Sequence, residues 1–314
     1  MKQLLCTAAR KLRGYLIGMA LIGSGRVRRA RRAAFAPGTL TILCFHKPRR
    51  ALFVKCVLWL IRHGYTFVSP DDVIEWVRQG RDLPAGAVWF TFDDGWREQL
   101  DDVLPVVERY RIPVTLFIPT RIVLGAGKYP WLHDERYPLP VDRPGTDGCD
   151  SRAEVREALT ESEIRKAAAC PVVTLGSHTA THALLPYCPE DRLRREIQES
   201  RQQLEQWSGK AVRTFAYPEG VTDPRAESVL RECGIAAAVT TRNSFATAAD
   251  AWHLLPRFSV GDDIAWPQAI CSLVGVWRPA ADSILRLAGA GPARGAPERG
   301  AETAPDRCGS TAAG

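Results

Sequence analysis

The sequence predicts an α/β fold, a distorted (β/α)7-type barrel of about seven βα units. Short runs rich in β-branched and aromatic residues alternate with longer helical patterns from Thr39 onward, which is typical of parallel βα units. About seven or eight such runs favour a closed or nearly closed barrel over an open sheet. Several runs also end directly in polar residues suited to catalysis, as strands do at the C-terminal rim of an α/β barrel.

The individual elements follow from this alternation. Strands are expected at residues 40–45, 65–68, 87–92, 114–118, 172–175, 212–216, 236–240 and 254–258. Helices are expected at 51–63, 70–79, 97–110, 161–169, 189–207, 223–233 and 264–275. Ser69 is a favoured N-cap residue and Pro70 a favoured first helical residue, which fixes one helix start. Residues 119–150, rich in Pro, Gly and Asp, are expected to be a long βα insertion that shapes a binding rim.

The composition is that of an ordinary soluble globular protein. The 314 residues are 46% hydrophobic and 25% charged, which excludes wholesale disorder, a coiled coil and a polytopic membrane protein. The nine cysteines are scattered and never form a C-x-x-C motif. They are expected to be free, mostly buried thiols in a reducing compartment rather than disulfides or a zinc ribbon.

The net charge of +7 is concentrated at the N-terminus. Residues 1–36 hold nine of the 42 Lys and Arg and no Asp or Glu, which leaves 33 basic against 35 acidic side chains in the remainder. The body therefore has no reason to attract a phosphate backbone, and nucleic acid is not an expected partner.

The chain divides into a basic arm (1–37), a catalytic body (38–278) and a tail (279–314) whose Ala, Gly, Pro, Arg and Glu content predicts disorder. Twelve uncharged residues separate Arg13 from Arg26, too few for the roughly 20 that span a bilayer. Five arginines lie between this uncharged stretch and a possible cleavage site at Ala34-Phe35-Ala36, which argues against signal-peptide cleavage. The arm either lies on an anionic membrane leaflet or is simply solvated. The expected location is the cytoplasm or the face of the cytoplasmic membrane, with export left open.

Two adjacent carboxylates, Asp93 and Asp94, follow a buried strand directly. Such a pair would raise the pKa of one carboxyl group unless a cation removed the repulsion. The alternative interpretation is an Asp-Gly turn with a helix cap.

Two histidines, His178 and His182, follow another expected strand at an interval of four. On a helical turn this spacing places both rings on one side, where they can coordinate one metal ion. Two imidazoles and one carboxylate leave positions open for water and substrate, as in catalytic divalent-metal sites. His46 and Arg257 also follow expected strands.

Three motifs in order, TFDDG, SHTATH and FAYPEG, together with ILCFH, VTLFIPT and LPRF, resemble the polysaccharide deacetylases of the NodB-homology type, carbohydrate esterase family four. The resemblance covers about residues 38–260. It implies a distorted (β/α) barrel and removal of N- or O-acetyl groups from sugars with a divalent metal, commonly zinc and sometimes cobalt or nickel.

The resemblance also implies residue roles. Asp94, His178 and His182 would hold the metal, and Asp93 would accept a proton from the metal-bound water. A backbone N–H just after Tyr217 would help to stabilise the oxyanion. Pro218 and Gly220 would form a turn at the substrate, or else an ordinary strand-to-helix turn.

Two family features are absent at their usual places. The arginine of the R-P-P-Y motif is missing, so Arg257, or less favourably Arg213, is expected to pair with Asp93. The histidine of the L-x-H motif has no clear match. His46 could act as the general acid or line the substrate cleft. His253 is a fallback, although a partly buried histidine beside Trp252 is the simpler interpretation.

The favoured function is a metal-dependent hydrolase that removes an acetyl or another small acyl group from an amino sugar of a polysaccharide or lipid-linked glycan. The basic arm links the protein to a lipid-linked or nascent cell-surface glycan. The alternatives are a carbohydrate-binding barrel that has lost turnover and an O-acetyl esterase acting on a polysaccharide.

Overall fold

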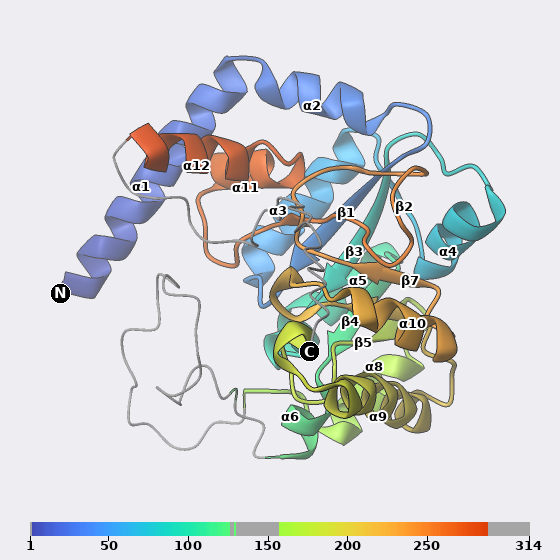
Figure 1. The fold of residues 1–314 in the computed structure, drawn as a ribbon. Helices are drawn as coiled ribbons and strands as arrows, with labels where there is room; N and C mark the ends of the chain where they lie inside the picture. The colour runs from blue at the N-terminus through green and yellow to red at the C-terminus, as the bar shows by residue number, and fades with distance from the viewer. Residues whose placement is uncertain (1, 126–128, 130–156, 288–314) are drawn as a thin grey trace, which may run out of the picture.

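The fold is built on one curved, mainly parallel sheet in the order β7-β6-β5-β4-β3-β1-β8 (Figure 1). The computed structural model describes residues 2–125, 129 and 157–287. The central strands are β1 (Thr39–Phe45), β3 (Ala87–Phe92) and β4 (Val114–Ile118), followed outward by β5 (Val173–Ser177), β6 (Thr214–Ala216) and β7 (Ala237–Val239). The strand β3 is buried on both faces, as expected for a parallel sheet that helices cover on one side and a barrel interior fills on the other. The short β2 (Thr66–Phe67) pairs with the start of β3.

The segment 252–260 closes the sheet between its two ends. Its Leu255 exchanges backbone hydrogen bonds with β7, from Leu255 N to Ala238 O (2.9 Å) and from Thr240 N to Leu255 O (2.8 Å). Three residues on, β9 (Phe258–Ser259) runs parallel to β1. The prediction of one strand at 254–258 is therefore wrong in its bounds. The segment pairs with β7 at Leu255 and with β1 from Phe258 onward, and Pro256 between them has no N–H to donate to a sheet. β8 (Ala246–Thr247) also covers part of β1. The predicted distorted barrel is confirmed.

Helices of the expected positions surround the sheet: α3 (Arg50–Arg62), α4 (Pro70–Gln79), α5 (Leu104–Tyr110), α8 (Glu161–Ala169), α9 (Glu190–Ser208), α10 (Pro224–Glu232) and α11 (Trp266–Leu273). Capping boxes start α4 at Ser69 and α8 at Thr160. The expected helix 97–110 is divided into a π-helical turn, Gln99–Val103, and α5. Of the predicted insertion 119–150, the structure describes α6 (Thr120–Leu124) and Tyr129, and the rest lies outside the described residues.

The N-terminal region is not a separate arm. It forms α1 (Lys2–Gly23) and α2 (Arg26–Ala34), and α1 lies against α11 and α12 (Trp277–Leu287) in Figure 1. A Cβ atom at Gly18 would come within 2.6 Å of the backbone of Pro267, so glycine allows the two helices to touch. Leu21 and Val27 share a small core with Cys271, Val274 and Ala280.

The same contacts correct the predicted C-terminal boundary. Residues 279–287 belong to α12 rather than to a disordered tail, because Ala280 is buried against the N-terminal helices, a contact that composition does not reveal. Residues 288–314 lie outside the described part. Among the described helices, none combines the length and the apolar character needed to cross a bilayer. The six cysteines whose side chains are described are free and buried.

Candidate active site

Six of the predicted site residues meet at the C-terminal ends of the parallel strands. Asp93 and Asp94 follow β3, His178 and His182 follow β5, and His46 follows β1. Arg257 reaches the same place from the closing segment, directly before β9. All except His46, which is partly exposed, are buried. The structure thus brings together residues that lie up to about 210 positions apart, as the C-terminal rim of a barrel does.

Asp94, His178 and His182 form a candidate metal centre. Asp94 Oδ1 lies 3.5 Å from His178 Nε2 and 3.3 Å from His182 Nε2. This oxygen is buried and, within the described structure, accepts no hydrogen bond. An unsatisfied buried carboxylate oxygen costs free energy, and a cation between it and the two ring nitrogens would remove that cost. The three side chains therefore fit a divalent metal.

The spacing of the two histidines predicts a helical turn, but the structure has none at these residues. Residues 178–184 form a loop, and the backbone of Thr179 and His182 is left-handed, with φ of 61° and 59°. Asp94 is left-handed as well, with φ of 72°. Such conformations cost free energy in residues other than glycine. Here these backbone conformations let the side chains of Asp94, His178 and His182 converge on one point.

Hydrogen bonds from outside the trio orient its members. Trp96 Nε1 donates to Asp94 Oδ2 (3.0 Å), which leaves Oδ1 to face the histidines. Tyr129 Oη donates to the carbonyl of Asp94 (2.6 Å), and the rings of Trp96 and Tyr129 pack 4.0 Å apart. His178 Nδ1 lies 2.7 Å from the carbonyl of Ala216, so the proton on Nδ1 leaves Nε2 free to bind a metal.

The sequence interpretation missed Trp96 and Tyr129. Trp96 lies directly after the TFDDG motif, and a buried indole there needs an acceptor for its N–H, which was a usable signal. Tyr129 belongs to the predicted insertion, where no pattern marks it.

Charge interactions hold both aspartates ionised. Burial raises the pKa of Asp94, but the imidazoles of His178 and His182 outweigh it and hold that pKa well below its usual range. In turn, burial lowers the pKa of His178, and the Asp94 and Asp93 carboxylates outweigh it and raise that pKa.

Asp93 is fixed by a buried bidentate pair with Arg257. Arg257 Nη1 donates to Asp93 Oδ1 (2.8 Å) and Nη2 to Oδ2 (2.7 Å). Burial raises the pKa of Asp93, but the charge of Arg257 outweighs it and the pKa falls to about 2. Arg213, the less favoured predicted partner of Asp93, instead pairs with Asp71 at the surface.

The sequence around these site residues matches a family model. The family model described as polysaccharide deacetylase matches residues 80–238, slightly more than half of the chain. The chain belongs to the polysaccharide deacetylase family. The prediction of a polysaccharide deacetylase is confirmed. The matched range contains Asp93, Asp94, His178 and His182, but neither His46 nor Arg257.

Relatives and solved structures agree with this membership. The poly-beta-1,6-N-acetyl-D-glucosamine N-deacetylase of Staphylococcus aureus (strain MSSA476) is 20% identical over 219 residues, 67% of each chain. The Streptococcus pyogenes deacetylase PplD, solved in complex with acetate, has a TM-score of 0.60 at 20% identity and covers 76% of this chain and 99% of its own. IcaB from Ammonifex degensii has a TM-score of 0.59 at 22% identity and covers 76% and 97%. These structures show the same fold.

In this deacetylase, His46 stands beside both aspartates. One of its ring nitrogens, an Asp93 oxygen and the Cys44 sulfur lie within 4.8 Å of one another. These three groups resemble a second metal site, but Arg257 already occupies both Asp93 oxygens and would repel a cation. Burial raises the pKa of the Cys44 thiol, which lies 3.4 Å from Asp93 Oδ2 and donates to it as a neutral group.

Gln99 ties the loops of His46 and Asp93 together. Its buried side-chain Nε2 donates to the carbonyls of both residues, at 2.7 Å each. Gln99 begins the π-helical turn, a local distortion that is frequent at functional sites. No sequence pattern identified this residue.

Replacing Gln99 with leucine is expected to destabilise the enzyme by about 2–4 kcal/mol, because two buried carbonyl groups lose their donors. Acetate release should fall with it, since both loops lose a common anchor. Urea unfolding and an acetate assay measure the two effects. The matched control is Gln202→Leu on the exposed face of α9, which should change neither. An unaltered activity in a folded Gln99→Leu enzyme would remove Gln99 from the site.

The substrate-facing predictions at the third motif are altered by the structure. The position directly after Tyr217 is Pro218, which has no N–H and cannot donate to an oxyanion. The Tyr217 ring is buried against Phe215, with centroids 5.1 Å apart. A Cβ atom at Gly220 would lie 2.6 Å from Thr241 N, so packing alone explains this glycine. A role of Tyr217, Pro218 and Gly220 in substrate binding stays a prediction.

His253 is not near the metal centre. Its Nε2 lies 2.9 Å from the carbonyl of Ile235, just before β7 begins, at the barrel end opposite to the catalytic rim. Burial lowers its pKa. The interpretation as a buried histidine holds, and the fallback role as general acid does not.

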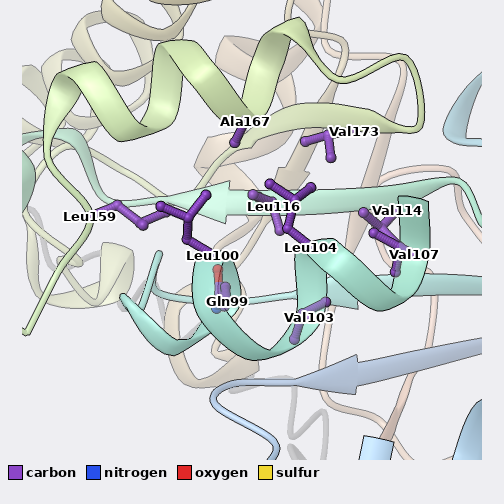
Figure 2. A pocket seen from close by; sticks show the side chains of 10 residues that line it. All are labelled: Gln99, Leu100, Val103, Leu104, Val107, Val114, Leu116, Leu159, Ala167 and Val173. Carbon is purple, nitrogen blue, oxygen red and sulfur yellow. The ribbon is translucent and has the colours of Figure 1, made fainter. Parts of the chain in front are cut away.

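A small cavity beneath Gln99 is separate from the site. Figure 2 shows its lining, in which every side chain other than Gln99 is a hydrocarbon. It lies between the π-helical turn, α5, β4 and α8, and its volume of about 10 Å³ could hold no more than one water molecule. It cannot receive a sugar.

Proposed function

We propose that this enzyme removes the N-acetyl group from amino sugars of a polysaccharide with the help of a divalent cation, most simply Zn²⁺, held by Asp94, His178 and His182. The proposal depends on one observation above the others. An unsatisfied, buried Asp94 oxygen faces two imidazole nitrogens, beside a second aspartate that Arg257 fixes in place.

The donor set suits zinc. Two nitrogen ligands and one oxygen ligand, with further positions open, are typical of catalytic zinc sites, and Co²⁺ and Ni²⁺ accept the same ligands. When bound, the cation would polarise the acyl carbonyl group and make water a stronger nucleophile.

Asp93 would act as the general base. Arg257 keeps it ionised, and Oδ1 accepts one hydrogen bond from the described residues, so this oxygen retains a lone pair for a water proton. As the water oxygen bonds to the carbonyl carbon and the C–N bond breaks, Asp93 takes one proton from the water. His46, half-buried beside both aspartates, would supply a proton to the departing amine. The products are acetate and an amino sugar.

The substrate we propose is a polymer of N-acetylglucosamine, because the Staphylococcus aureus relative is named for the β-1,6-linked form. Deacetylation turns a neutral amide into an amine that is cationic at neutral pH. A lipid-linked form of this glycan, and a location at the cytoplasmic membrane, belong to the proposal through the basic residues 1–36.

The test is acetate release from β-1,6- and β-1,4-linked N-acetylglucosamine oligomers after removal of metal by a chelator. We expect no release from the metal-free enzyme and recovery with Zn²⁺, Co²⁺ or Ni²⁺. Elemental analysis should find metal in the wild type and in Asp101→Asn, an exposed control, but not in Asp94→Asn.

Two other outcomes would select the alternatives. Hydrolysis of acetyl esters without any amide hydrolysis would indicate an O-acetyl esterase. Oligomer binding without acyl release in the metal-loaded protein would indicate a carbohydrate-binding barrel. The structure weakens the latter idea, since Arg257 supplies the partner of Asp93 that the third motif lacks.

A further inference from the structure

The helix α1 has two apolar faces, and only one of them is covered. Gly14, Gly18 and Leu21 are buried, and Gly14 and Gly18 lie against α11. Leu12, Tyr15, Leu16 and Met19 are exposed, at 61%, 48%, 59% and 46%. At 100° per residue, the exposed set points away from the buried set. We call these four side chains the outer face of α1.

This exposure is unusual for the molecule. Ten large hydrophobic side chains are exposed in the described part of the chain, and four of them form this outer face. Their spacing of three, one and three residues makes them neighbours on one side of the helix. A contiguous exposed apolar strip of this kind marks an interaction surface.

The charge around the outer face indicates its partner. Residues 1–36 contain nine Lys and Arg and no acidic residue. Arg13 is exposed on α1, and Arg26, Arg28, Arg29 and Arg32 are exposed on α2. Among the described residues, these five arginines form no ion pair. An apolar strip on a helix with basic flanks is the pattern of a helix that lies in the plane of an anionic membrane.

The helix α1 is also linked to the catalytic rim. Lys11 Nζ lies 2.7 Å from Asp263 Oδ1, and the neighbouring Asp262 accepts a hydrogen bond from the backbone N–H of Lys47 (2.9 Å). Lys47 directly follows His46. The helix that would touch the membrane is therefore joined, through two aspartates, to the loop that carries a predicted catalytic residue.

We propose that the outer face of α1 lies on an anionic lipid surface and holds the mouth of the active site beside it, so that the substrate is a glycan attached to that surface. The attachment of the substrate rests on the proposed function, whereas the contact with lipid does not.

Surface substitutions are the appropriate test. Deleting residues 1–36 would expose Cys271 and Val274, which these helices bury, and could unfold the protein. We compare Tyr15→Ser/Leu16→Ser with Tyr187→Ser/Leu254→Ser, which removes the same side-chain types from exposed positions elsewhere. The full-length chain is mixed with vesicles of phosphatidylcholine that contain about a quarter phosphatidylglycerol, and co-sedimentation is measured.

The wild type and the control pair should sediment with these vesicles, and Tyr15→Ser/Leu16→Ser should bind at least tenfold more weakly. The vesicle affinity of Arg13→Gln/Arg26→Gln should fall about tenfold or more, because each cation near an anionic surface adds to the affinity. Pure phosphatidylcholine should bind the wild type weakly. Equal binding of all variants would overturn the proposal. So would a concentration-dependent dimer that Tyr15→Ser/Leu16→Ser abolishes without any vesicle binding, since the partner would then be a second copy.

Activity separates the two parts of the proposal. With N-acetylglucosamine oligomers coupled to a vesicle lipid, kcat/KM should fall about tenfold in Tyr15→Ser/Leu16→Ser, while kcat/KM on free oligomers should stay within about twofold of the wild type. Vesicle binding by Asp93→Asn should equal that of the wild type, so a failure of the proposed catalytic function leaves the lipid contact testable. Equal losses on both substrates would overturn the link between the outer face and the rim.

Discussion

Replacing Arg257 with methionine is expected to destabilise the protein by about 3–5 kcal/mol, because it leaves the Asp93 carboxylate buried without its counter-charge. Methionine fills much of the same space, so the loss of stability arises from the missing charge more than from a cavity. Arg257 also donates to the carbonyl of Thr240 and to Thr91 Oγ1, which adds to the cost. Chemical unfolding at neutral pH measures it. The control is Arg213→Met, which removes a surface ion pair with Asp71 and should cost less than about 1 kcal/mol.

The contribution of Asp93 to the free energy of unfolding should depend on pH with opposite signs in Arg257→Met and in the wild type. In the wild type the pKa of Asp93 is lowered to about 2 from an ordinary value of 3.8. The stabilisation is therefore complete above pH 3.8 and is lost as the pH falls toward 2. Without Arg257, burial is the largest influence and raises the pKa of Asp93. The folded variant then binds a proton more readily than the unfolded chain, and its deficit should shrink as the pH falls.

Both outcomes can be contradicted. If Arg257→Met unfolds at the same denaturant concentration as the wild type, the buried pair contributes nothing to stability. A deficit that stays constant from pH 7 to pH 4 would show that Asp93 is not the group affected.

Replacing Asp93 with asparagine is expected to lower kcat by about 10²–10⁴-fold, the range for loss of a general base. The amide is nearly isosteric and its oxygen can still accept from Arg257, so metal content should stay at the wild-type level. Acetate release from N-acetylglucosamine oligomers and elemental analysis measure the two quantities. Asp102→Asn, on the nearby π-helical turn, serves as the control and should change neither.

This prediction separates the roles of the two adjacent aspartates. Asp94→Asn should lose the metal, whereas Asp93→Asn should keep it and lose turnover. If Asp93→Asn instead loses metal, Asp93 is a ligand, and the division between base and ligand that we propose is wrong. If it keeps both metal and turnover, another group accepts the proton.

Several features could be predicted because they depend on residues close together in the chain. Each strand that carries a site residue has a run of buried side chains that ends in a polar residue, as at Phe92 and Asp93. The alternation of such runs with helices predicts a parallel sheet, and a parallel sheet places the ends of its strands at one rim. The pairing of Arg257 with Asp93, across 164 positions, was expected only because the resemblance to a family implied an arginine that the third motif lacks.

Other features could not be predicted because local sequence does not encode them. The interval of four suggested a helical turn for His178 and His182, yet left-handed residues in a loop produce the convergence. Nothing in the local pattern shows that Gln99 would reach two carbonyl groups or that Tyr129 would reach Asp94. The composition of residues 1–36 likewise indicated an arm that either lies on a membrane or is solvated, and did not show that a glycine face docks α1 on α11.

The sequence by itself determined the strand order along the chain, the family, and which side chains can bind a metal or carry a proton, since these depend on residue type and short-range spacing. Only the tertiary structure decided how those side chains are aimed and which face of α1 stays open. Aim depends on contacts between segments that are distant in the chain, and these exist only after the sheet has closed and the helices have packed against it.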